Sequence, residues 1–120
     1  MMDILADWLP RIGALFTILL GLVGFFKPRL ITDAQQIELG GPMALSEARV
    51  VFGGLHLGSG AMALALNEPV IYMTLGVAWG FAVLARFYSM VVDKTSLQQS
   101  LPGIIVDGVM TALFLSGMFL

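Results

Sequence analysis

Four long apolar stretches, separated by short polar segments, account for most of the sequence. They cover about residues 8–26, 45–66, 69–92 and 101–120. A transmembrane helix needs about 20 apolar residues, because each residue advances the helix by about 1.5 Å and the hydrocarbon core of a bilayer is about 30 Å thick. Short connections favour antiparallel neighbours. The pattern therefore predicts an all-α, polytopic membrane protein in which residues 1–120 form a single antiparallel bundle of four transmembrane helices.

The polar segments contain residues that are typical of helix ends and turns. Pro28 is expected to stop the first helix, because a proline disfavours helical geometry in the residue before it. Residues 33–38 are expected to form a short surface turn of helix, and Ser46 to cap the start of the second helix. Residues 67–69 predict a tight turn, with the proline at the first position of the third helix.

Basic residues are distributed unevenly between the two ends of the predicted bundle. Lys27, Arg29 and Lys94 lie in the two longer polar segments, whereas Arg11 is the basic residue nearest to the termini. Because loops rich in Lys and Arg stay in the cytoplasm, we expect the two longer polar segments in the cytoplasm and both termini on the opposite side of the membrane. The first apolar stretch follows acidic residues and precedes no small-residue cleavage site, which favours a retained membrane helix over a signal peptide.

The composition supports a lipid environment and excludes several classes of function. The chain is 58% hydrophobic and 12% charged, whereas about a quarter of the residues of a typical soluble domain are charged. The net charge of −2 provides no basic field for nucleic acid. The chain has no cysteine, which excludes disulfides, zinc–thiolate sites and iron–sulfur ligation.

Four charged residues are expected at similar depth, close to the cytoplasmic boundary: Glu47, Arg49, Arg86 and Asp107. A charge at membrane depth costs about 2.5–3.5 kcal/mol unless it finds a partner or water. Because a short loop joins the third and fourth helices, Arg86 and Asp107 are predicted to pair. The hypothesis is that all four residues form one polar cluster. The cluster either fixes the register of the helices or binds an anionic headgroup, a small substrate or a proton.

His56 is the single histidine and lies roughly 15 Å along the second helix. It could act as a proton relay, a metal ligand or an axial ligand of a pigment or haem. The alternative is a neutral histidine that donates a hydrogen bond to a carbonyl. One histidine in a chain without cysteine cannot form a conventional metal site, so we expect no metal and no cofactor.

Helical phase separates the second helix into two faces. At 100° per residue, one face combines polar side chains with glycines, and consists of Arg49, Gly53, His56 and Gly60. The opposite face is a strip of small residues that begins with an acid, and consists of Glu47, Gly54, Gly58, Ala61 and Ala65.

Small residues allow close approach of membrane helices. Six glycines are therefore expected at helix contacts: Gly53, Gly54, Gly58, Gly76, Gly80 and Gly108. A phosphate-binding loop is not expected at Gly53 and Gly54, since no strand precedes them and no Lys-Ser/Thr follows.

The second helix also carries a signature that resembles a known bacterial family. The signature is Glu47-x-Arg49-x-x-Phe52-Gly53-Gly54 followed by Leu57-Gly58, with Ala85-Arg86 on the third helix and an acid early in the fourth. It resembles a family of small four-helix membrane proteins known only as a domain of unknown function, over nearly the whole chain. That family usually has tyrosine at the position of Phe52 and commonly glutamate at the position of Asp107. A more distant likeness to the DoxX-like group rests on architecture. The resemblance implies the fold, the cluster residues and a bacterial inner membrane, in which both termini would face the periplasm. It implies no mechanism.

No catalytic residues are expected, because no serine has a motif for activation and no nucleophile–base pair is evident. We therefore expect a non-enzymatic accessory or scaffold subunit of a larger membrane complex, or a self-associating bundle. Its partners would be membrane lipids and other membrane protein subunits or a second copy, and not nucleic acid. The alternative is a small transporter, or a bundle that binds a lipid or small molecule through the Arg/acid cluster.

Overall fold

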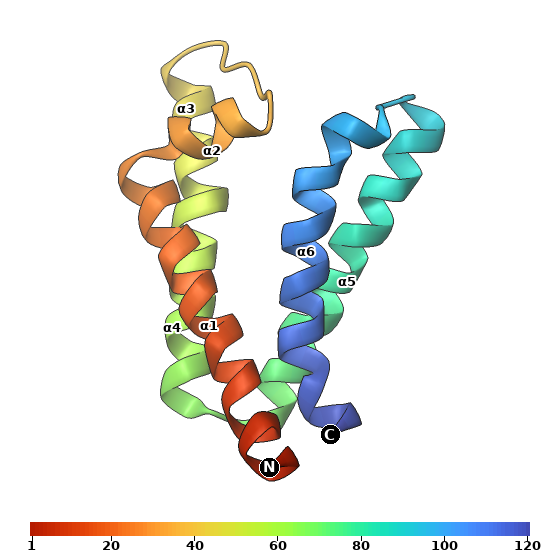
Figure 1. Cartoon of the computed structure of the whole chain (residues 1–120). Helices are drawn as coiled ribbons and strands as arrows, with labels where there is room; N and C mark the ends of the chain where they lie inside the picture. The colour runs from red at the N-terminus through yellow and green to blue at the C-terminus, as the bar shows by residue number, and fades with distance from the viewer. The chain divides into compact units, whose positions relative to one another are not determined.

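The computed structural model describes residues 1–120 and is all-helical, without strands (Figure 1). Its elements are α1 (Met2–Phe26), α2 (Pro28–Ala34), α3 (Pro42–Ala48), the π-helix η1 (Arg49–Leu55), α4 (His56–Leu66), α5 (Pro69–Val92) and α6 (Leu97–Phe119). The segments α3, η1 and α4 follow one another without a break. Four helices, at 2–26, 42–66, 69–92 and 97–119, are long and apolar enough to cross a membrane. The prediction of an all-helical chain with four such helices is confirmed.

The contacts within the chain divide it into two compact units. The first unit contains residues 1–13 and 68–120, and the second contains residues 14–67. Helix α1 contributes its beginning to the first unit and its remainder to the second. The single four-helix domain remains a prediction.

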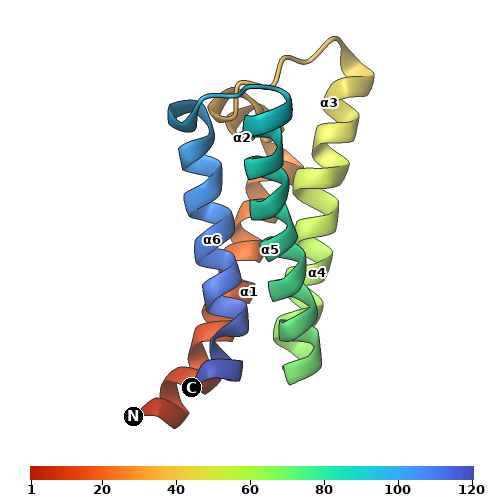
Figure 2. The ribbon, with the colours of Figure 1, turned by 90° about the vertical axis from the view of Figure 1, so that its right-hand side faces the viewer.

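In the first unit, α5 and α6 form a hairpin of antiparallel helices, which lie side by side in both Figure 1 and Figure 2. A Cβ atom added to Gly76 would lie 2.5 Å from Leu115 Cδ2, so α5 and α6 approach closely at this glycine, and a larger residue would require the Leu115 side chain to move. The rings of Tyr72 and Phe114 stack with their centroids 6.1 Å apart. Apolar packing therefore dominates the half of the hairpin that is closer to the termini.

The ends of the hairpin helices follow from local capping. Pro69 begins α5, where a proline loses no helical hydrogen bond, as predicted. Helix α6 begins at Leu97 and not near residue 101, because the Ser96 hydroxyl accepts a hydrogen bond of 3.0 Å from the Gln99 N–H and caps the helix. The polar residues after Ser96 are thus the first turn of α6 and not part of a loop.

Helix α1 also begins earlier than predicted, at Met2 instead of near residue 8. Arg11 forms an ion pair with Asp7 at 3.2 Å, one helical turn away. The Arg11 guanidinium also lies 4.8 Å from the centroid of the Trp8 ring. These contacts between neighbouring turns support helical structure in the residues that precede the predicted apolar stretch.

In the second unit, the remainder of α1 runs antiparallel to η1 and α4 in direct backbone contact. A Cβ atom on Gly53 would lie 2.5 Å from the Phe25 N and Cα atoms, and one on Gly21 would lie 2.5 Å from the Leu57 N atom. Further along, a Cβ atom on Gly60 would lie 3.0 Å from the Ile18 N atom. Glycines on both helices therefore set the distance between them.

The connection between α1 and α3 differs from the predicted one. Helix α1 ends at Phe26, as expected, and Pro28 is the first residue of α2. The short helix thus covers Pro28–Ala34 and not residues 33–38. Ser46 is inside α3 and is not its cap, because Pro42 follows Gly41 at the first helical position and starts the helix four residues earlier.

The π-helix η1 covers the middle of the predicted signature. In a π-helix the backbone bonds to the fifth residue instead of the fourth, so each turn contains more residues than an α-helical turn. The faces derived at a constant 100° per residue therefore do not continue across Arg49–Leu55. Glu47, which precedes η1, is rotated relative to the strip formed by Gly58, Ala61 and Ala65 on α4.

Candidate functional site

The predicted pair of Arg86 and Asp107 is present. The Arg86 Nε–H donates to Asp107 Oδ2, which forms an ion pair between α5 and α6. Asp107 is 3% exposed. A charged group buried to this extent is stable only when it is paired. The Thr111 hydroxyl donates to the Asp107 backbone carbonyl at 2.7 Å, one turn further along α6.

Gly103 provides the space for the Arg86 guanidinium. A Cβ atom at Gly103 would lie 2.7 Å from Arg86 Nε and still closer to the Cζ and Nη1 atoms. The guanidinium therefore lies directly against the backbone of α6. Gly103 was not among the predicted site residues, although its position four residues before Asp107 places it on the same face of the helix.

A cavity of about 380 Å³ opens beside the ion pair. Seven residues of the first unit line it: Ala82, Ala85, Arg86, Ser89, Thr95, Ser100 and Asp107. The Ser100 hydroxyl donates to Thr95 Oγ1 at 3.2 Å. The volume of the cavity is within the range of about 300–1,000 Å³ for small-molecule pockets. Hydroxyl groups beside an arginine suit a small ligand that carries hydrogen-bond acceptors.

Arg49 has a different partner, in the second unit. Its Nη1–H donates to the backbone carbonyl of Phe25 in the last turn of α1. The last four carbonyls of a helix have no partner within the helix, and a basic side chain there also interacts favourably with the helix dipole. Arg49 therefore caps α1 from η1. Glu47 is exposed on α3.

His56 is hydrogen-bonded across the π turn. Its Nδ1 atom lies 2.8 Å from the Val51 carbonyl oxygen, and since a carbonyl only accepts, Nδ1 carries the hydrogen. The backbone N–H of His56 donates instead to the Gly53 carbonyl. This contact agrees with the alternative in which the histidine donates to a carbonyl. No group of three or more His, Cys, Asp or Glu side chains is placed to hold a metal ion.

The six predicted packing glycines differ in their surroundings. Gly53 and Gly76 are in close contacts, and a Cβ atom at Gly80 would lie 3.6 Å from Thr111 Cγ2. Three others have open space where a Cβ atom would stand: Gly54, Gly58 and Gly108. A packing role for these three remains a prediction. Gly24, which was not predicted, has no room for a Cβ atom because the Phe52 carbonyl lies directly against it.

The predicted site residues therefore belong to two separate arrangements. Arg86 and Asp107 meet in the first unit, whereas Glu47, Arg49 and His56 belong to the second. The single cluster of charges remains a prediction, and so does the resemblance to the family of small membrane proteins. No family model, no curated protein and no solved structure matches this chain.

Proposed function

We propose that the chain is an integral protein of a bacterial inner membrane, in which its four long helices form an antiparallel bundle with both termini in the periplasm. The supporting observation is the amount of large apolar surface at exposed positions along these helices, such as Leu19, Phe81 and Val91. Soluble monomers rarely expose contiguous apolar patches of more than a few hundred Å². Retention of the protein in the membrane pellet after an alkaline wash is the expected result, and release into the supernatant would contradict it.

Within the membrane, the chain acts as a non-enzymatic scaffold or accessory subunit, or associates with a second copy. The observation that carries this proposal is a strip of small, exposed residues on η1 and α4: Gly54, Gly58, Ala61 and Ala65. A Cβ atom on Gly54 or Gly58 would meet no atom within 4 Å. Small residues on a membrane helix let another helix approach closely. The strip is therefore suited to contact with a helix of another chain.

Matched leucine substitutions test the scaffold proposal. Ala61→Leu places a large side chain on the strip, whereas Ala78→Leu places the same side chain at an exposed position on α5. We expect Ala61→Leu to reduce the recovery of partner subunits, or of a tagged second copy, in mild detergent, and Ala78→Leu to leave it unchanged. Purification of the unaltered protein only as a monomer without partners would contradict the proposal.

A second candidate function is binding or transport of a small molecule, which the cavity beside Arg86 favours. Its lining combines three hydroxyl side chains with the Arg86–Asp107 ion pair, and the guanidinium, which bonds Asp107 through Nε, has further N–H donors for an acceptor-rich ligand such as a small carboxylate. Here the test is thermal unfolding in the presence of a panel of small carboxylates. Stabilisation that disappears when Ser89→Leu fills the cavity would support this function, and the absence of any stabilisation would contradict it.

A further inference from the structure

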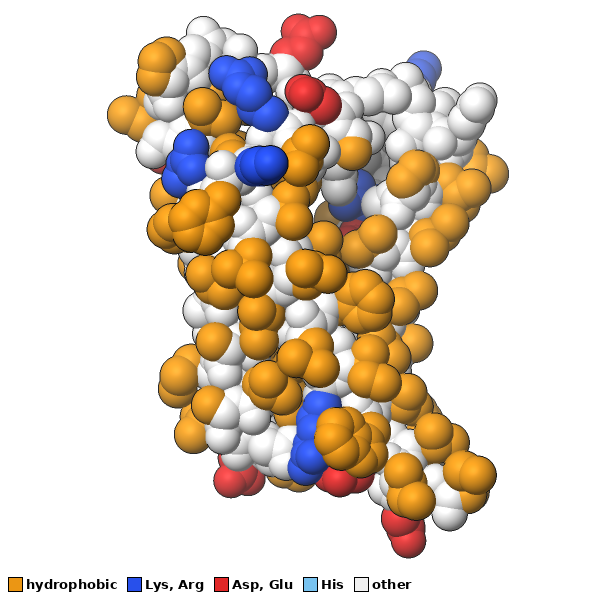
Figure 3. Space-filling model, turned by 60° about the vertical axis from the view of Figure 1, so that its left-hand side comes forward, with side chains coloured by type: hydrophobic (Ala, Val, Ile, Leu, Met, Phe, Trp, Pro, Cys, Tyr) orange, Lys and Arg blue, Asp and Glu red, His pale blue; other side chains and the backbone are white.

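A second cavity, of about 340 Å³, lies at the end of α1 in the second unit. Its lining combines basic and apolar side chains: Phe26, Lys27, Pro28, Arg29, Leu30, Leu45 and Arg49. Three of the six Lys and Arg residues of the chain are thus gathered in one place, although the net charge of the chain is −2. Figure 3 shows Lys and Arg side chains gathered among hydrophobic ones at the end of the molecule where α2 lies.

The positive charges of this cavity are not neutralised by the chain. The ion pairs of the structure are Arg11 with Asp7 and Arg86 with Asp107, and neither involves Lys27, Arg29 or Arg49. Asp33 lies one turn after Arg29 on α2, and Glu47 lies two residues before Arg49, but both acids are exposed and form no ion pair with these cations. An anion from outside the chain would therefore meet three positive charges.

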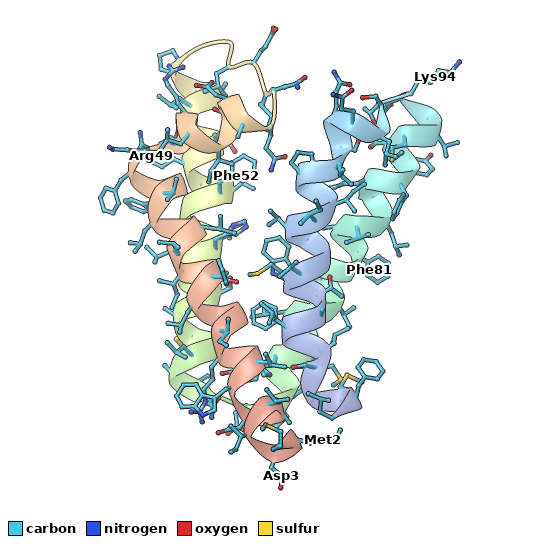
Figure 4. The ribbon with its side chains drawn as sticks, in the orientation of Figure 1. Met2, Asp3, Arg49, Phe52, Phe81 and Lys94 are labelled. Atoms are coloured by element: carbon cyan, nitrogen blue, oxygen red, sulfur yellow. The ribbon has the colours of Figure 1, made fainter.

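Arg49 is held in place for such a role. Its Nη1–H donates to the Phe25 carbonyl, which fixes one edge of the guanidinium against α1. A guanidinium has five N–H donors in a planar fork, so further donors remain for an anion. Figure 4 shows the Arg49 side chain extending outward beside the end of α1. Because the side chain is already fixed, less conformational entropy is lost when an anion binds.

The apolar part of the lining distinguishes a lipid from a free anion. Phe26 and Leu30 are 69% and 60% exposed beside the three cations. Along α1, Leu22 and Leu19 continue this exposed apolar surface for two further turns. The cations are followed along α1 by apolar side chains, just as the phosphate of a phospholipid is followed by acyl chains. Inorganic phosphate has no apolar part, so its binding would not be strengthened by these side chains. Basic pockets beside membrane helices on the cytoplasmic side are a known way to recognise anionic headgroups.

We propose that Lys27, Arg29 and Arg49 bind the phosphate of an anionic phospholipid headgroup, while the acyl chains lie along the exposed apolar side of α1. The proposal rests on the membrane location proposed above. Arg49 connects η1 to the end of α1, while Lys27, between α1 and α2, and Arg29, on α2, would contact the same phosphate. The bound lipid therefore stabilises the second unit at the end where its helices are connected by the longest polar segment.

The experiment measures lipid binding to the full-length protein in mild detergent by native mass spectrometry. Short-chain phosphatidylglycerol is compared with phosphatidylcholine of the same chain length. The variants are Lys27→Gln and Arg29→Gln, singly and together, and the matched control is Lys94→Gln, which removes a loop cation from outside the cavity. Each basic residue near a membrane surface contributes about 1 kcal/mol, so each cavity substitution should weaken binding of phosphatidylglycerol about fivefold.

The expected result is preferential binding of phosphatidylglycerol, weakened about fivefold by each cavity variant and unchanged by Lys94→Gln. Equal binding of the two lipids, or equal weakening by Lys94→Gln, would overturn the proposal. Competition by millimolar inorganic phosphate that displaces the lipid fully would show a free-anion site instead, and would also overturn it. The alkaline wash of the membranes is a separate measurement, so failure of the membrane location is distinguished from failure of the lipid site.

Discussion

The two units hold their helices together by different means. In the first unit, α5 and α6 are joined by the side chains of Arg86 and Asp107, with Gly103 making room for the guanidinium. In the second unit, α1 and η1 approach until Gly24 and Gly53 contact the backbone of the opposite helix. A contact between side chains can adjust by rotation about their bonds, whereas a contact between backbones cannot. The second unit should therefore tolerate added volume less well than the first.

The largest effect is expected for Gly53→Ala. Its new Cβ atom would lie 2.5 Å from the Phe25 N and Cα atoms, so one helix must move. We expect a loss of about 3 kcal/mol in the free energy of unfolding, at the upper end of the range for overpacking. Thermal and denaturant unfolding in detergent measure this change.

Gly54→Ala is the matched control, because the adjacent glycine has open space at the same position. Replacement of a helical glycine by alanine there should leave stability unchanged or raise it by about 0.5–1 kcal/mol. Equal destabilisation by the two substitutions would show that the helices do not meet at Gly53.

The next effect is expected for Asp107→Ala, which leaves the Arg86 guanidinium without its carboxylate. Since Arg86 is partly exposed, water compensates part of the loss, and we expect a destabilisation of about 2 kcal/mol, below the range for fully buried pairs. The double variant Arg86→Met/Asp107→Leu should be more stable than Asp107→Ala, because it removes both charges together. A double variant less stable than the single one would contradict this explanation.

A smaller effect is expected for Gly103→Ala. The added Cβ atom meets the end of the Arg86 side chain, which can rotate away, so we expect a loss of about 1 kcal/mol. Gly108→Ala adds the same atom in open space on the same helix and should have no such effect. Comparable losses in both variants, measured by thermal unfolding, would point to a general effect on α6.

The smallest effect is expected for His56→Phe, which keeps a ring but removes the donor to the Val51 carbonyl. A single hydrogen bond of this kind contributes about 1 kcal/mol, and the added apolar surface offsets part of that loss. Amide hydrogen exchange should rise in η1 and stay unchanged in α5. No change in exchange within η1 would show that the histidine does not support the π turn.

The sequence was sufficient to predict the features that depend on hydropathy and on the position of a residue along its helix. The bounds of α5 follow from Pro69 at its start and Asp93 after its end, and the pairing of Arg86 with Asp107 follows from two charges at similar depth on adjacent helices. The early start of α1 was not accessible, because its stability depends on the contacts of Arg11 with Asp7 and Trp8 rather than on hydropathy.

Features that depend on exact backbone geometry could not be predicted from the sequence. Periodicity assumes one helical pitch, so it cannot reveal that Arg49–Leu55 is a π-helix. The contacts of Gly24 and Gly53 depend on where two backbones cross, which small-residue spacing suggests only broadly. From the sequence, Lys27 and Arg29 were used only to predict the orientation of the chain in the membrane. Their proximity to Arg49 could not be predicted, because it depends on how the chain turns back through α2.

A double-mutant cycle shows whether the ion pair of the first unit couples α5 to α6. Unfolding free energies are compared for the unaltered protein, Arg86→Ala, Asp107→Ala and the double variant, in the same detergent. We expect the two substitutions to be coupled by at least about 1 kcal/mol, as for contacting residues in one polar network. Additive effects of the two substitutions would contradict this expectation and show that Arg86 and Asp107 do not hold α5 and α6 together.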